Sequence, residues 1–159
     1  MIELKTPADK IAFKKLVKAE CTKQINQRIT NAKAAIAQAQ DNANSNDKST
    51  AGDKYEISRA MGQLDSDMNS KQLNEAEQEL SYLEKIDVSK LENTIKIGSV
   101  FELSGILFFV AIGLGPLKIV DKRVMVVSSR SPFYENIKTM QAGQVFEFQD
   151  KMDEIKMVF

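Results

Sequence analysis

A heptad pattern of apolar residues in the first third of the chain restricts its fold more than any other feature. From Ile25 onward the apolar positions are separated by steps of 4, 3, 4, 3 and 4 residues, at Ile29, Ala32, Ile36, Ala39 and Ala43. This spacing predicts a long helix whose apolar seam pairs with a second helix in a coiled coil. Thr6 and Asp9 are candidate caps for its start, where Pro7 is tolerated.

A second helical pattern follows a polar segment, residues 42–52, that is rich in turn-forming residues. It resumes at about Asp53 with apolar positions at Met61, Leu64, Met68, Leu73, Ala76, Leu80 and Leu83. The step from Met68 to Leu73 is irregular, a stutter in the repeat. We therefore expect residues 1–90 to form an antiparallel coiled-coil hairpin of roughly 50 Å, with an acidic tip near residues 41–59.

The two predicted helices carry opposite charge. Residues 1–33 hold eight Lys and Arg against three Asp and Glu, whereas residues 34–90 hold six against eleven. Opposite net charges favour pairing of the two helices and leave a basic face on the first helix. Such a face is usually solvated and paired with neighbouring acids; the alternative is a stripe that follows the phosphates of RNA.

The residue pattern changes after a linker at 87–93. Short apolar or alternating runs predict strands at Ile95–Leu103, Ile106–Ile112, Arg123–Ser128, Gln144–Phe148 and Glu154–Phe159. Ser131 and Pro132 predict the start of a short helix between the third and fourth of these. The expected fold class is α+β, with residues 91–159 forming one twisted antiparallel sheet on a short helix.

Composition limits the chemistry and the compartment. The chain has one cysteine, Cys21, and no histidine, so it offers no Ser-His-Asp triad and no intrachain disulfide. The first ten residues are charged and lack the apolar core of a signal peptide. The longest apolar run, Ile106 to Gly115, is about half of a membrane-spanning helix. We expect a cytoplasmic protein without a membrane partner, and Cys21 to be buried and inert.

The carboxylates of Asp53 and Glu56 are the main candidate site residues. The structural interpretation is a capping box, in which an Asp at the N-cap and a Glu three residues later satisfy the first backbone N–H groups of a helix. The functional interpretation is a pair of exposed acids, one turn apart at the tip of a thin rod, that share a divalent cation. One residue can do both.

Three stretches of the sequence together resemble the Gre family of bacterial transcript-cleavage factors. They are AGDKYEISRAMGQLD (51–65), IKIGSVFEL (95–103) and VVSSRSPFYENIKTMQAGQVFEF (126–148). The first is similar to the family's coiled-coil tip with its Asp-x-x-Glu pair, and the third to its segment around Ser-Pro. The departures are Arg130 before Ser-Pro, Ile137–Met140 in place of Leu-Leu-Gly-Lys, and Gly143-Gln144 in place of Gly-Asp.

The resemblance implies a monomeric factor with no active site or cofactor of its own. Its coiled coil would enter the secondary channel of RNA polymerase, where Asp53 and Glu56 would help to hold the second Mg²⁺ of the polymerase and its attacking water. An FKBP-like C-terminal domain would grip the channel rim, with Arg130, Ser131 and Pro132 near that contact. The residues near the tip that would contact RNA or the channel are Lys48, Lys54, Tyr55 and Arg59; Asp47 is a weaker third acid.

Two other functions stay open at this point. One is a Gre-like regulator that enters the same channel and inhibits the polymerase; the Asp53 and Glu56 pair disfavours it, because a plug needs no metal-ligating acids. The other is a coiled-coil adaptor that grips a protein partner with its tip, which the polar tip disfavours. A free-standing enzyme is disfavoured further, since the sequence carries no nucleophile–base set and no Gly-rich phosphate loop.

Overall fold

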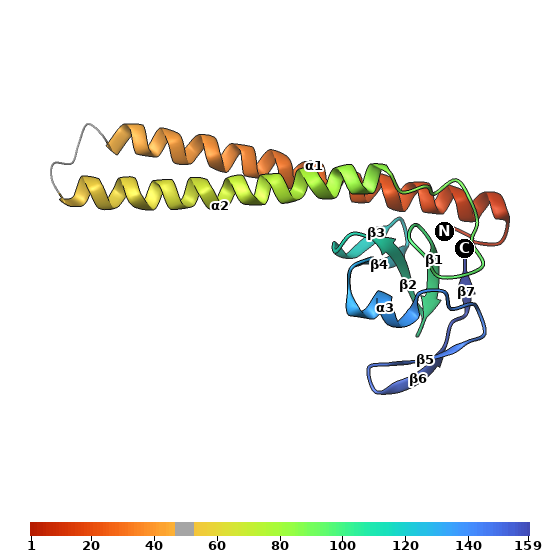
Figure 1. Ribbon diagram of the computed structural model, residues 1–159. Helices are drawn as coiled ribbons and strands as arrows, with labels where there is room; N and C mark the ends of the chain where they lie inside the picture. Colours follow the sequence, from red (N-terminus) through yellow and green to blue (C-terminus); the bar gives the residue numbers. More distant parts are fainter. Residues whose placement is uncertain (47–52) are drawn as a thin grey trace. The chain divides into compact units, whose positions relative to one another are not determined.

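The computed structural model describes residues 1–46 and 53–159, except the side chains of 43–46, 53 and 55. Two long helices, α1 (Pro7–Asn46) and α2 (Asp53–Glu84), precede a region of short strands (Figure 1). This arrangement confirms the predicted α+β class. Within the described residues, neither helix is apolar enough over its length to cross a membrane.

The start of α1 is fixed by the predicted caps. The Thr6 N–H donates to Asp9 Oδ2 at 3.0 Å, and the Asp9 N–H donates to Thr6 Oγ1 at 3.1 Å. This reciprocal pair satisfies N–H groups that lack a partner within the helix. The Thr6 N–H group also lowers the pKa of Asp9, because it stabilises the ionised carboxyl group.

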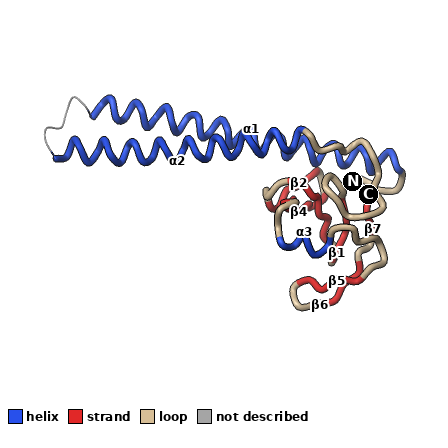
Figure 2. Tube along the Cα trace, in the orientation of Figure 1, coloured by secondary structure: helices blue, strands red, loops and turns tan. Residues whose placement is uncertain are grey.

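Residues Lys23–Ser81 form one compact unit, in which parts of α1 and α2 run side by side (Figures 1 and 2). Ile25 and Ala32 of α1 and Ala76 of α2 are buried in this unit. Arg28 Nη1 lies 3.7 Å from Glu79 Oε2, an ion pair between the two helices. Small residues at the seam, such as Ala32 and Ala76, allow the helix axes to approach closely.

The predicted seam is wrong for three residues of α2. Met61, Leu64 and Met68 are exposed, at 61%, 63% and 61% of their surface. The stutter is the physical reason. At 3.6 residues per turn, the five-residue step from Met68 to Leu73 rotates the apolar stripe by roughly a third of a turn. The less exposed positions in this part of α2 are instead small or polar: Ser58, Gly62, Ser66 and Asn69.

Residues Met1–Thr22 and Tyr82–Phe159 form the other compact unit, built on a five-stranded sheet of order β3-β4-β2-β1-β7. Its strands are β1 (Val100–Leu103), β2 (Ile106–Ala111), β3 (Gly115–Ile119), β4 (Lys122–Ser128) and β7 (Met157–Val158). A separate two-stranded ribbon pairs β5 (Val145–Phe148) with β6 (Lys151–Glu154). The short helix α3 (Pro132–Ile137) follows β4, as predicted.

The sheet is mixed and not purely antiparallel, which corrects the prediction. Strands β2 and β4 are parallel, whereas β1–β2, β1–β7 and β3–β4 are antiparallel. The cause is the three-residue connection 112–114, where the Leu114 N–H donates to the Ile112 carbonyl oxygen at 3.0 Å. This tight turn carries the chain to the edge strand β3, so that β4 returns between β3 and β2.

Several strand boundaries also differ from the prediction. Strand β1 begins only at Val100, and the predicted strand Glu154–Phe159 is divided between the end of β6 and the short β7. Strands β3 and β6 were not predicted. Strand β3 contains Pro116, a residue that sheets accept at an edge, and β6 is mostly polar.

The first turns of α1 belong to the core beside the sheet. The rings of Phe13 and Phe159 lie 6.4 Å apart, and the Lys10 ammonium lies 5.5 Å from the centre of the Phe159 ring. Phe13, Val17 and Phe159 are all buried. The sequence suggested a division of the chain after residue 90. The compact units are divided differently, because the unit with the strands also contains residues 1–22 and 82–90.

Candidate functional site

The predicted acidic site lies at the start of α2. Asp53 is the first residue of the helix, whereas the capping-box interpretation places it at the N-cap, one position before the first helical residue; Glu56 follows in the first turn with an exposed side chain. The side chains of Asp53 and Tyr55, and residues Asp47 and Lys48, lie outside the described part of the chain. The roles predicted for these four residues stay predictions.

The described side chains of this turn are all accessible. Lys54, Glu56 and Arg59 are exposed, and Glu56 and Arg59 line one shallow depression on α2 with Ala60 and Gln63. A solvated carboxylate beside a guanidinium can contribute an oxygen ligand to a cation held elsewhere, or contact a phosphate. Within residues 1–46 and 53–159, the described side chains form no cluster of three or more metal-ligating residues.

The predicted docking residues lie in the turn before α3. Ser131 is the N-cap of α3: its Oγ accepts the Tyr134 N–H at 3.2 Å and donates to the Ser128 carbonyl oxygen at 2.7 Å. Its hydroxyl group therefore orders the turn. Arg130 and Pro132 on either side are exposed, so they are the members of this group that can contact a partner.

Arg130 is held in place by the end of α2. Its guanidinium carbon lies 5.8 Å from the centre of the Tyr82 ring, in a cation–π contact. The Tyr82 hydroxyl is 2.6 Å from Ser129 Oγ, and the Arg130 N–H donates to Ser128 Oγ at 3.1 Å. These contacts give the basic side chain a defined position on the surface of the unit that contains the sheet.

A group that the sequence interpretation missed is formed by two lysines of α1, one turn apart. Lys14 is fully buried and its Nζ donates to the Lys90 carbonyl oxygen at 2.6 Å. Lys18 Nζ donates to the carbonyl oxygens of Ile86 at 2.7 Å and Glu84 at 3.2 Å. The two cations thus bind the carbonyl group of the last residue of α2, Glu84, and two carbonyl groups of the segment that follows it.

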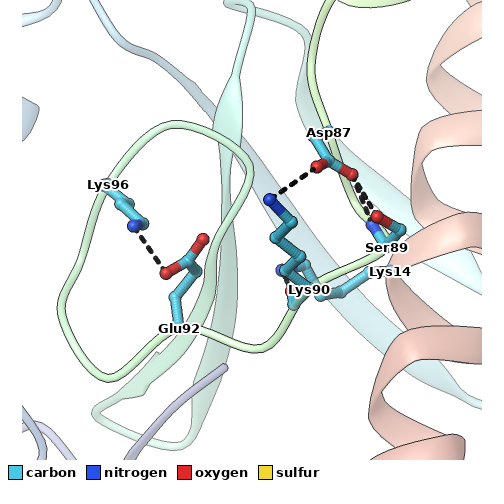
Figure 3. Close-up of polar contacts among 6 residues, drawn as sticks. All are labelled: Lys14, Asp87, Ser89, Lys90, Glu92 and Lys96. Carbon is cyan, nitrogen blue, oxygen red and sulfur yellow. Dashed lines mark hydrogen bonds and ion pairs between the residues drawn. The ribbon is translucent and has the colours of Figure 1, made fainter.

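The segment after α2 is ordered by further polar contacts around Lys14 (Figure 3). Asp87 Oδ1 accepts hydrogen bonds from the Ser89 hydroxyl at 2.5 Å and the Ser89 N–H at 2.8 Å. Lys96 Nζ lies 2.6 Å from Glu92 Oε2. Burial lowers the pKa of Lys14, because the charged form loses hydration; the carboxylates of Glu92 and Asp87 oppose this effect.

These contacts correct the description of the basic face of α1. Lys14 and Lys18 are neither part of a solvated face nor free to follow RNA, since they bind backbone carbonyl groups within the fold. Arg28, by contrast, pairs with Glu79 of α2 as mutual pairing predicts. The available signal was position: Lys14 and Lys18 each directly follow a seam residue, Phe13 and Val17.

No family model and no curated protein matches the sequence.

Proposed function

We propose that this protein is a transcription elongation factor that inserts a coiled-coil hairpin, formed by α1 and α2, into the secondary channel of RNA polymerase. There it stimulates Mg²⁺-dependent cleavage of backtracked RNA by the active site of the polymerase. One observation carries the proposal: Glu56 is an exposed acid in the first turn of a 32-residue helix that begins with a second acid, Asp53. The resemblance of residues 51–65, 95–103 and 126–148 to the Gre family supports it.

The dimensions of the helices suit this role. A helix of 32 residues is about 48 Å long, and a pair of helices joined by small seam residues is narrow. A helix pair of that length and width can carry a carboxylate to a metal ion that a wider globular domain cannot approach. Within Lys23–Ser81, the ion pair of Arg28 with Glu79 joins the two helices and favours a fixed arrangement of one helix on the other.

The chemistry assigned to the acids is modest. Asp53 and Glu56 supply oxygen atoms to a Mg²⁺ that belongs to the polymerase, and thereby stabilise the ion and orient its attacking water. The protein acts as a stimulator and not as an enzyme, and it holds no cofactor of its own. The cationic residues near the acids, Lys54 and Arg59, are exposed and can contact the RNA 3′ end. Lys48 and Tyr55 have the same proposed role.

The C-terminal strands are proposed to form an FKBP-like domain that docks on the channel rim in the cytoplasm. Arg130 and Pro132 are exposed on either side of the N-cap Ser131. The position of Arg130 over Tyr82 supports a contact with an acidic surface, because a cation that is already oriented loses less entropy on binding.

The test is a cleavage assay on a stalled, backtracked elongation complex with the polymerase of the source organism. Faster Mg²⁺-dependent release of RNA 3′ fragments in the presence of the protein supports the proposal. Binding without stimulation replaces it with the channel-entering regulator. If the protein does not bind the polymerase, the coiled-coil adaptor becomes the better account.

A further inference from the structure

A groove in the unit that contains the sheet is lined by the segment Met1–Lys5, which precedes α1, and by parts of β1, β2, β4 and β7. Its volume is about 720 Å³, within the range of sites that hold ligands. Glu102, Lys122 and Arg123 contribute charged side chains to this groove, here called the N-terminal groove. The apolar residues that line it include Ile2, Leu4, Ile106, Leu107 and Met157.

Two charges of the N-terminal groove lie at fixed places across the sheet. Glu102 of β1 is opposite Leu107 of β2, and Leu107 is opposite Val124 of β4. Lys122 is two residues before Val124, so it lies on the same face of the sheet as Glu102. With about 4.8 Å between strands and about 3.3 Å per residue, the Cα atoms of Glu102 and Lys122 are roughly 12 Å apart. The apolar Leu107 lies on the strand between them.

These charged side chains are not neutralised by close contacts. Within residues 1–46 and 53–159, Glu102, Lys122 and Arg123 form no ion pair and no side-chain hydrogen bond. Lys122 has a longer-range attraction to Asp121, whose carboxylate already accepts the Ile2 N–H at 3.0 Å. Glu102 and Lys122 are only partly exposed. Because partly buried charges without partners are costly, the groove favours a ligand that brings an opposite charge to each.

The segment Met1–Lys5 adds free backbone groups to the groove. Ile2 and Leu4 are half-buried and the residues on either side are exposed, which is the two-residue period of an extended chain. The backbones of Glu3 and Leu4 form no hydrogen bond with any described residue. An extended chain with unpaired N–H and C=O groups is a template to which a second extended chain can add.

We propose that the N-terminal groove binds an extended peptide segment of a partner protein. The peptide carries a basic and an acidic side chain four residues apart, with an apolar side chain midway between them. In an extended chain these three side chains share one face, and the two charged residues are roughly 13 Å apart, close to the separation of Glu102 and Lys122. This inference does not depend on the proposed function.

Each part of the peptide has a contact in the groove. The basic side chain pairs with Glu102, and the acidic side chain pairs with Lys122 and Arg123. The apolar side chain packs on Leu107, and the peptide backbone bonds to the segment Met1–Lys5. A nucleic acid fits less well, because Glu102 repels phosphate groups and the exposed Lys5 is already paired with Glu3 at 3.1 Å.

Titration of the full chain with capped peptides, followed by NMR of the backbone amides, tests the site. The probe is Lys-Thr-Val-Thr-Glu, and the control peptides carry Lys at both ends or Glu at both ends. We expect the probe to bind at least about fivefold more tightly than either control and to shift the amide signals of Glu3, Leu4 and Glu102. The proposal is overturned if the probe does not bind up to about 1 mM or shifts only other residues. Shifts of the same signals with protein concentration alone would assign the groove to a second copy, and would also overturn it.

Charge reversal tests the assigned contacts. Glu102→Lys should weaken binding of the probe by about tenfold or more and tighten binding of the peptide with two Glu residues. Lys122→Glu should instead tighten binding of the peptide with two Lys residues, which keeps the test valid if one variant does not fold. Glu147→Lys, at an exposed acid of β5 that does not line the groove, is the matched control and should bind as the wild type does. If folded Glu102→Lys and Lys122→Glu variants keep the wild-type preference among the three peptides, the proposal is wrong.

Discussion

The Lys14 ammonium lies 2.6 Å from the carbonyl oxygen of Lys90, and the Lys14 side chain is fully buried in the unit that contains the sheet. The two residues are 76 positions apart, so the contact joins the first helix to the segment that follows the second. It also places a buried cation at the point where the chain changes from helices to strands.

Lys14→Ala should therefore destabilise the protein. The substitution removes buried methylene groups and leaves the Lys90 carbonyl without its donor, at a cost of about 2–4 kcal/mol in the free energy of unfolding. Lys15→Ala is the matched control, because Lys15 is exposed on the same helix and should cost less than about 0.5 kcal/mol. Chemical denaturation measures both, and equal stabilities would contradict the structural role of Lys14.

Asp87 provides a pH-dependent test. Hydrogen bonds from Ser89 hold the pKa of Asp87 below its usual value of 3.8, and the Ser89 hydroxyl has the largest effect. Because the folded-state pKa is depressed, the stabilisation is present above the unfolded pKa and is lost as pH falls through the folded value. Ser89→Ala should raise the pKa of Asp87 in an NMR titration of the carboxyl carbon. The pKa of Asp121, lowered chiefly by the Ile2 N–H, should not change.

Cys21 should be unreactive while the protein is folded. Burial raises the pKa of the Cys21 thiol to about 12, so the thiol stays protonated at pH 8. Ellman's reagent should label the native protein far more slowly than the urea-unfolded protein. Equal labelling rates would show that the α1 seam opens readily at this position.

The unit with the sheet should fold without the distal parts of the helices. A chain in which a short Gly-rich linker replaces residues 23–81 retains Phe13 and Val17, two buried side chains of the unit that contains the sheet. We expect it to unfold cooperatively. Residues 91–159 alone lack those side chains and should aggregate or stay unfolded, because the Phe159 side of the sheet is uncovered. Cooperative unfolding of the short fragment would contradict this.

The truncated chain also tests docking. Under the proposed function it should compete with the full-length protein for RNA polymerase but give no cleavage. Arg130→Ala in the same chain should weaken competition, whereas Lys151→Ala, which changes an exposed cation in β6, should not.

Local sequence signals were sufficient for the helices and insufficient for the sheet. The caps Thr6 and Ser131 bond within three residues, so their roles could be read from neighbouring positions. The parallel pairing of β2 with β4 depends on how the turn 112–114 directs the chain, and short apolar runs contain no information on order or direction. Strand β6 was not predicted because its residues are mostly polar and give no apolar or alternating pattern.

The same limit applies to the candidate site. Glu56 could be placed at the start of a helix from a four-residue pattern, and α2 does begin at Asp53. The partners of Lys14 and Lys18 could not be predicted, since the carbonyl groups that they bind lie more than 60 residues away. Met61, Leu64 and Met68 were wrongly assigned to the seam because a heptad pattern specifies one face of a helix but does not identify what covers that face.

The most direct test of the central claim is transcript cleavage with a Glu56→Gln variant, beside Asp53→Asn and the control Glu77→Gln on an exposed position farther along α2. The account predicts that the wild type and Glu77→Gln stimulate release of RNA 3′ fragments from a backtracked complex. Glu56→Gln and Asp53→Asn should lose at least about a hundredfold of that stimulation, as expected when a group that holds a catalytic metal or its water is removed, with polymerase binding unchanged. Wild-type cleavage rates in both tip variants would contradict it.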